Sequence, residues 1–212
     1  LFGKKNYAEK ALYNRMAETP ENVYSLLNQL RDAYMPAAKA EAQELQDYAT
    51  AHGLYATLQA WDWSYYSKKL QEEKYAISDD ILRPYFELEN VKNGVFNLAK
   101  KLYGLTFVKN DKIQVYHPEV DAYEVFDKKG KFVAVYYCDF HPREGKRGGA
   151  WMNDFKSQWK EDKKDSRPHI VNVMNFTRAT DDKPALLTYD EVETFLHEFG
   201  HGLHGMLTRC QY

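Results

Sequence analysis

The spacing of apolar and polar residues predicts helices over the first half of the chain. The stretch from about Tyr7 to Lys101 has a helical pattern, and Thr19 reads as an N-cap because Pro20 follows at the first helical position. A long helix is therefore expected to begin there. Pro36 should break or kink it, since proline lacks the N–H that a helix interior uses.

Further helices are expected before the pattern changes. A segment rich in Ala, Gln and Glu should stop at Gly53, and Asp62 should cap a helix that reaches about Lys74. Another helix should begin near Leu88 and stop at Gly104. Aromatic rings near residue 62 are expected to pack in the core and between helices, with the lining of a peptide channel as the alternative. These rings belong to Trp61, Trp63, Tyr65 and Tyr66.

The second half of the chain has the pattern of strands. Residues 123–126 and 132–138 are two apolar runs around a polar turn, which indicates a β-hairpin. Residues 158–168 read as a charged connection, and His169–Phe176 as a further strand. We expect this strand to lie at a sheet edge beside the last helix, where it could hold an extended peptide by main-chain hydrogen bonds.

These elements predict an α+β fold that is mainly α-helical with a small antiparallel or mixed β-sheet. Residues 1–110 would form a helical segment, and residues 111–212 the small sheet and the last helix. The chain does not begin with Met, so we expect one continuous piece of a larger domain.

The last helix is expected to begin after Thr188. Thr188 and Glu191 have the spacing of a capping box. An apolar stripe follows at steps of three and four residues, and three glycines near it are expected to provide clearance for a close neighbour. The stripe consists of Val192, Leu196, Phe199, Leu203 and Met206, and the glycines are Gly200, Gly202 and Gly205.

This helix carries the motif His-Glu-x-x-His. His197 and His201 are four residues apart, so they share one face of a helix, roughly opposite the apolar stripe, where two imidazoles can bind one Zn²⁺. Glu198 lies between them and can act as a general base. The motif therefore predicts metal-assisted peptide hydrolysis, with substrate-binding residues left unknown.

Net charge and cysteine count indicate which partners and which cellular compartment to expect. A formal net charge of -2 provides no broad basic field, so neither a nucleic acid nor a membrane surface is expected as a partner. Two cysteines are too few for a disulfide framework, which favours a reducing compartment such as the cytoplasm, with the periplasm as the alternative. No apolar run has membrane-spanning length, and the oligomeric state is unknown.

Several stretches resemble the thimet oligopeptidase-like zinc metallopeptidases, which include oligopeptidase A and bacterial peptidyl-dipeptidase. The resemblance covers most of the chain. The Gly-Lys-Arg-Gly-Gly-Ala-Trp form and the sequence Thr-Tyr-Asp-Glu-Val-Glu-Thr are most similar to the peptidyl-dipeptidase branch, whose members remove dipeptides from peptide C-termini. The matching stretches are 60–66, 82–86, 103–107, 142–151, 183–188 and 195–204.

The resemblance implies an incomplete zincin-like, thermolysin-like catalytic core. It makes His197 and His201 zinc ligands for one Zn²⁺ per complete site and Glu198 the general base. It also implies short peptides as substrates. The family's third ligand is a Glu on a later helix, which is expected beyond Tyr212. Absence of metal and of activity is therefore the alternative for this chain by itself.

Alternatives remain at three places. His204 is expected in the cleft rather than on the metal, and a metzincin site is excluded because that motif requires Gly at position 204 and His at position 207. The basic loop Arg143–Arg147 is expected to be solvated, with a substrate carboxylate as the alternative partner. A non-catalytic peptide-binding or structural piece is the alternative to a peptidase, because two His hold Zn²⁺ poorly without a third ligand.

Overall fold

The computed structural model describes residues 3–162 and 164–210. The chain forms two compact units, Leu1–Ile77 and Ser78–Tyr212. The expected division between residues 110 and 111 stays a prediction as a domain boundary.

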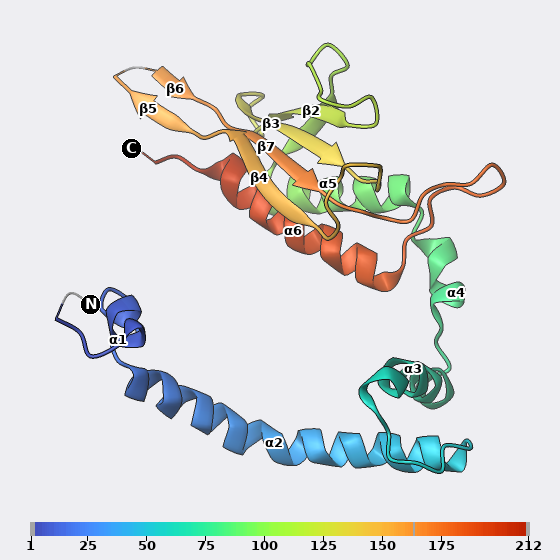
Figure 1. The fold of residues 1–212 in the computed structure, drawn as a ribbon. Coiled ribbons are helices and arrows are strands. Elements are labelled where there is room, and N and C mark those ends of the chain that lie inside the picture. Colours follow the sequence, from blue (N-terminus) through green and yellow to red (C-terminus); the bar gives the residue numbers. More distant parts are fainter. Residues whose placement is uncertain (1–2, 163, 211–212) are drawn as a thin grey trace. The chain divides into compact units, whose positions relative to one another are not determined.

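The first unit is helical. Its helices are α1 (Tyr7–Leu12), α2 (Pro20–Ala51) and α3 (Ala60–Tyr75) (Figure 1). Thr19 caps α2 as expected, since its hydroxyl accepts a hydrogen bond of 3.2 Å from the Asn22 N–H. Of the break or kink expected at Pro36, the break is wrong, because α2 continues through this residue, and the kink stays a prediction. A proline removes one helical hydrogen bond, and the alanines that follow it are strong helix formers.

Two further expectations for this unit are corrected. Gln59, not Asp62, is the N-cap of α3, and the Asp62 carboxylate accepts a hydrogen bond of 3.1 Å from the Gln59 N–H as the third helical residue. The aromatic residues of α3 are not core residues: Trp61 is 79% exposed and Trp63 45% exposed. The lining of a peptide channel therefore remains open as their alternative role.

The second unit combines helices with β-sheets. Its helical elements are α4 (Asp79–Leu82), the short 3-10 helix η1 (Arg83–Tyr85), α5 (Leu88–Tyr103) and α6 (Tyr189–Leu207). Its strands are β1 (Thr106–Lys109), β2 (Asp121–Phe126), β3 (Phe132–Asp139), β4 (Trp151–Lys156), β5 (Trp159–Glu161), β6 (Lys164–Ser166) and β7 (His169–Val173). An α+β fold with a small mixed sheet is thus confirmed.

The main sheet has the order β1-β2-β3-β7-β4. The predicted hairpin is present, with β2 and β3 antiparallel, whereas β3 and β7 are parallel. The expectation of an edge strand at residues 169–176 is wrong, because β7 pairs with β3 on one side and with β4 on the other. Among the described strands, β4 occupies that edge. The segment 158–168 is not a plain connection, since it contains the antiparallel pair β5 and β6.

The helices α5 and α6 cover one face of this sheet (Figure 1). Their core residues include Val95, Ala99, Phe195 and Phe199, which pack against sheet residues such as Tyr136. The opposite face carries a smaller apolar cluster with Val135, Tyr137 and Val171, covered in part by Ile113 and Val115. The helix α6 therefore packs on one face of the sheet, and the smaller cluster lies on the other face.

Candidate metal centre

The helix α6 is fixed at both ends. The Thr188 hydroxyl accepts from the Glu191 N–H at 3.1 Å, and the Glu191 carboxylate accepts from the Thr188 N–H at 2.8 Å, so the predicted capping box is confirmed. At the other end, the Arg167 guanidinium donates to the carbonyls of Met206 and Thr208 at 2.8 and 3.0 Å. It thereby satisfies terminal carbonyls that have no partner within the helix.

The buried face of α6 differs from the expected stripe at one position. Phe199 and Met206 are buried as expected, but Leu196 is 42% exposed and Phe195 takes its place in the core. Phe195 packs edge to face against Phe140, with ring centroids 5.2 Å apart. The side chain that faces the core at this point is therefore one residue earlier in the sequence than we expected.

Two of the three glycines provide the expected clearance. A Cβ on Gly202 would lie 3.1 Å from Asn172 Oδ1, and one on Gly205 would lie 2.7 Å from Ile170 Cδ1. Both contacts come from β7, so the helix approaches the sheet closely because these positions lack side chains. Gly200 has no neighbour within 4 Å of a Cβ and faces outward.

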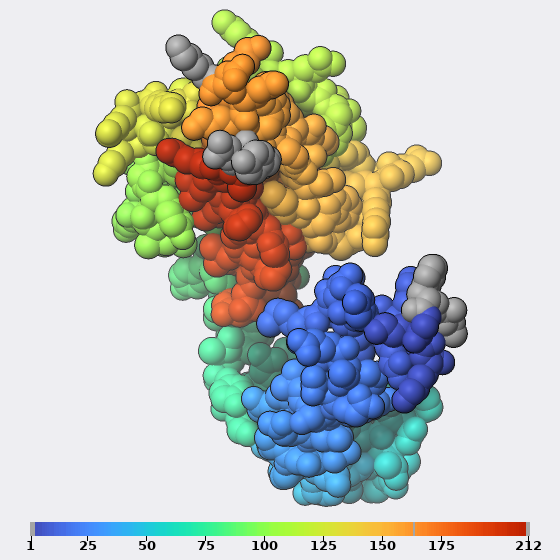
Figure 2. Space-filling view, turned by 90° about the vertical axis from the view of Figure 1, so that its left-hand side faces the viewer, coloured from blue at the N-terminus to red at the C-terminus, as the bar shows by residue number. Residues whose placement is uncertain are grey.

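The motif histidines are exposed on α6, opposite the buried residues Phe195, Phe199 and Met206. Figure 2 shows part of the surface of α6 (red) open to the viewer. His197 Nε2 and His201 Nε2 are 3.1 Å apart, and their rings are nearly perpendicular at 77°. Two nitrogens that share a tetrahedral Zn²⁺ at 2.0–2.1 Å would be separated by roughly 3.3 Å. The spacing of the pair therefore fits a zinc ion with little adjustment.

The described residues contain only part of a metal site. Within residues 3–162 and 164–210, no group of three or more His, Cys, Asp or Glu side chains comes together to hold a metal. His204 is exposed one turn beyond His201 and borders a hollow of about 550 Å³ with Tyr103 and Leu207. Glu198, which follows His197 in the sequence, is half-buried.

The residue that sequence reasoning missed is Asn172. It lies on β7 beneath α6, and its Nδ2 donates a hydrogen bond of 2.7 Å to the main-chain carbonyl of Glu198. Its signal in the sequence is an amide within an otherwise apolar strand, where a buried polar group must find partners.

The basic loop after β3 is only partly solvated, because two of its three cations are bonded to a carboxylate of this chain. Arg143 donates to both oxygens of Asp139, at 2.7 and 2.8 Å, and Lys146 donates to the same carboxylate at 2.8 Å. Burial opposes ionisation of Asp139, but these bonds and one from the Tyr116 hydroxyl outweigh it and lower its pKa to about 2. Only Arg147 in this loop remains an exposed cation.

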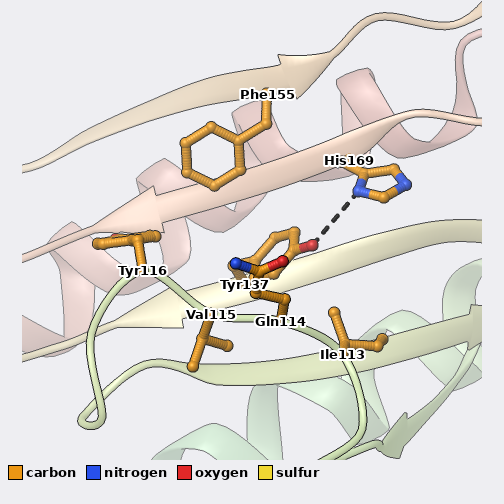
Figure 3. Close-up of a pocket in the computed structure, with 7 residues that line it drawn as sticks. All are labelled: Ile113, Gln114, Val115, Tyr116, Tyr137, Phe155 and His169. Atoms are coloured by element: carbon orange, nitrogen blue, oxygen red, sulfur yellow. Dashed lines mark hydrogen bonds between the residues drawn. The ribbon is translucent and has the colours of Figure 1, made fainter.

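A second hollow lies on the opposite face of the sheet, away from the motif. Figure 3 shows Tyr137, Phe155 and His169 among the side chains that line it. The hollow has a volume of about 450 Å³, and His169 Nδ1 lies 3.3 Å from the Tyr137 hydroxyl. Burial, together with the charge of Lys156, lowers the pKa of His169. Because α6 covers the other face, this hollow does not contain the motif residues.

An exposed His pair with a Glu between them on a helix beside a sheet is an arrangement that metal-dependent peptidases use. The family model for peptidase family M3 matches residues 1–212 of this chain. The chain belongs to peptidase family M3, which confirms the resemblance drawn from the sequence.

Curated relatives match over nearly the whole of this chain. Oligopeptidase A of Escherichia coli is 42% identical over 212 residues, which is 100% of this chain and 31% of the relative. Dipeptidyl carboxypeptidase of Salmonella typhimurium is 40% identical over 213 residues, again 100% of this chain and 31% of the relative. Saccharolysin of Saccharomyces cerevisiae is 34% identical, over 98% and 31% of the two chains. The chain thus spans about a third of the length of these relatives.

In the described part of the chain, no helix is both long enough and apolar enough to cross a membrane.

Proposed function

We propose that this chain provides part of the active site of a zinc metallopeptidase. The observation that carries the proposal is the pair of Nε2 atoms of His197 and His201, 3.1 Å apart on the open face of α6. Family membership supports it. The third ligand would be a Glu beyond Tyr212 in the full-length protein, and it would complete a zincin-like core.

Each motif residue has a defined task. His197 and His201 would hold the metal through Nε2 as neutral imidazoles. Zinc, when bound, supplies Lewis acidity toward the scissile carbonyl and lowers the pKa of water. The Glu198 carboxylate would take the proton of the attacking water and pass it to the leaving nitrogen.

The peptide would lie along the free edge of β4. This strand is the outer neighbour of β7 among the described strands, and α6 packs against both. Its edge offers main-chain donors and acceptors to an extended peptide next to the motif. We propose short peptides as substrates and release of C-terminal dipeptides as the reaction, with internal cleavage by an oligopeptidase as the alternative.

The second candidate is a non-catalytic peptide-binding or structural piece. It is favoured for this chain alone, because within the described residues no third His, Cys, Asp or Glu joins the His pair to hold a metal. Absence of nucleic-acid and membrane partners, and a cytoplasmic location, stay predictions.

The test is the zinc content of the full-length protein and of three His variants. His197→Ala and His201→Ala should lose stoichiometric zinc, whereas His204→Ala, a matched change on the same face of α6, should retain it. Mass spectrometry of the products from a blocked peptide separates dipeptide release from internal cleavage. Retention of one zinc per chain by both His197→Ala and His201→Ala would refute the proposed ligands.

A further inference from the structure

Asn172 is a buried amide in the middle of an apolar strand. Its flanking residues on β7 are Val171 and Val173, which point to the opposite face of the sheet. Asn172 itself has an exposed fraction of 0% and points toward α6. A buried amide is costly unless its donors and acceptor are satisfied, so its partners show what it holds.

Both ends of this amide are engaged. Nδ2 donates to the main-chain carbonyl of Glu198 at 2.7 Å, and Oδ1 accepts from the Tyr136 hydroxyl at 2.5 Å. A carbonyl can only accept, so the NH2 group must face α6 and the oxygen must face Tyr136. The orientation of the Asn172 side chain is therefore set by its two neighbours.

The contacts described here between Asn172 and α6 lie within one turn of the helix. In an α-helix the carbonyl of residue 198 also accepts from the N–H of residue 202. Gly202 is the position at which a Cβ would come within 3.1 Å of Asn172 Oδ1, so the amide lies directly against the Glu198–Gly202 turn. His201 is on this same turn, and His197 is the residue directly before Glu198.

We propose that Asn172 is the positioning residue that sets the depth and the rotation of this turn, and with them the place of Glu198 relative to the metal. The inference rests on the proposed function. Asn172 lies under the helix, on the side away from the histidine face, and its bonds run to the main chain of Glu198 and to the Tyr136 hydroxyl. It acts through the main chain of Glu198, because a side chain follows any rotation of its own turn.

The competing explanation is that Asn172 serves only stability. In that case its loss would lower the unfolding temperature but leave each folded, zinc-loaded molecule as active as before. Positioning predicts a change in kcat per zinc-loaded molecule, since a displacement of about 1 Å at a catalytic group can cost on the order of a hundredfold in rate.

The experiment uses the full-length protein with Asn172→Leu, which keeps the size of the side chain and removes both hydrogen bonds. Val171→Ala is the matched control, because Val171 is the adjacent buried residue of β7 and faces away from α6. Measured quantities are kcat and KM at saturating zinc, the zinc dissociation constant by chelator competition, and the unfolding temperature.

For Asn172→Leu we expect kcat to fall about 10- to 100-fold and zinc to bind about tenfold more weakly, with KM changed by less than about threefold. Val171→Ala should lose stability but keep kcat. A kcat within about twofold of the unaltered protein in zinc-saturated Asn172→Leu would overturn the proposal.

Two further variants keep the result interpretable. Tyr136→Phe is used if Asn172→Leu does not fold, because it removes only the hydroxyl that orients the amide. It should lower kcat by about threefold or more with the fold intact. An unchanged kcat in Tyr136→Phe overturns the proposal as well. Glu198→Gln separates the two levels of inference. If that variant is inactive while Asn172→Leu is fully active, the positioning role fails and the peptidase function stands.

Discussion

Gly200 and Gly202 allow the fit of α6 to be tested with the same substitution at two positions of one helix. Replacement of a helical Gly by Ala stabilises a helix by about 1 kcal/mol when the new methyl group has room. At Gly200 no atom lies within 4 Å of the added Cβ, so Gly200→Ala should raise the free energy of unfolding by about 1 kcal/mol.

At Gly202 the added Cβ would lie 3.1 Å from Asn172 Oδ1. The amide has no room to withdraw, because it is fully buried and bonded to Tyr136 and to Glu198. Such overpacking costs about 1 to 3 kcal/mol, which offsets the helical gain, so Gly202→Ala should be neutral to destabilising by about 2 kcal/mol.

Urea unfolding of both variants measures the difference, which should be about 1 to 3 kcal/mol in favour of Gly200→Ala. The free energies of unfolding are compared at equal zinc loading, since bound metal also stabilises the folded state. Equal stabilisation by both substitutions would show that α6 does not lie against Asn172 as described.

Three other predictions concern the buried carboxylate of Asp139 and the two ends of α6. The pKa of Asp139 is lowered on folding, so its ionised form stabilises the fold by about 2 kcal/mol above about pH 4. This contribution is lost as pH falls toward 2. The free energy of unfolding of Asp139→Asn should lack this loss. Thr188→Ala removes the N-cap and should cost about 1 kcal/mol in urea unfolding, with no loss if the Glu191 carboxylate alone caps α6. Arg167→Met should cost about 3 kcal/mol, because three carbonyls lose a charged donor, and a cost below about 0.5 kcal/mol would contradict those bonds.

Features that depend on neighbours in the sequence could be predicted. The start of α6 follows from a box of four residues, and the common face of His197 and His201 follows from helical geometry alone. The hairpin of β2 and β3 was also local, since a polar turn separates two apolar runs.

Features that depend on distant pairing could not be predicted in the same way. Whether β7 lies inside the sheet or at its edge is decided by β4, an exposed strand whose polar residues give no clear alternation. The basic loop was expected to be solvated, because the sequence does not show that folding buries the Asp139 carboxylate against Arg143. Leu196 and Phe195 are both apolar neighbours, so the sequence pattern alone did not show which one faces the core.

The central claim is that Glu198 acts as the base beside a zinc ion held by the motif histidines. Its most direct test is the rate of peptide hydrolysis by zinc-loaded, full-length Glu198→Gln, compared with Glu193→Gln, an exposed glutamate of the same helix. We expect Glu198→Gln to retain its zinc and lose kcat by on the order of a thousandfold or more, with Glu193→Gln unaffected. Full activity of zinc-loaded Glu198→Gln would contradict the account.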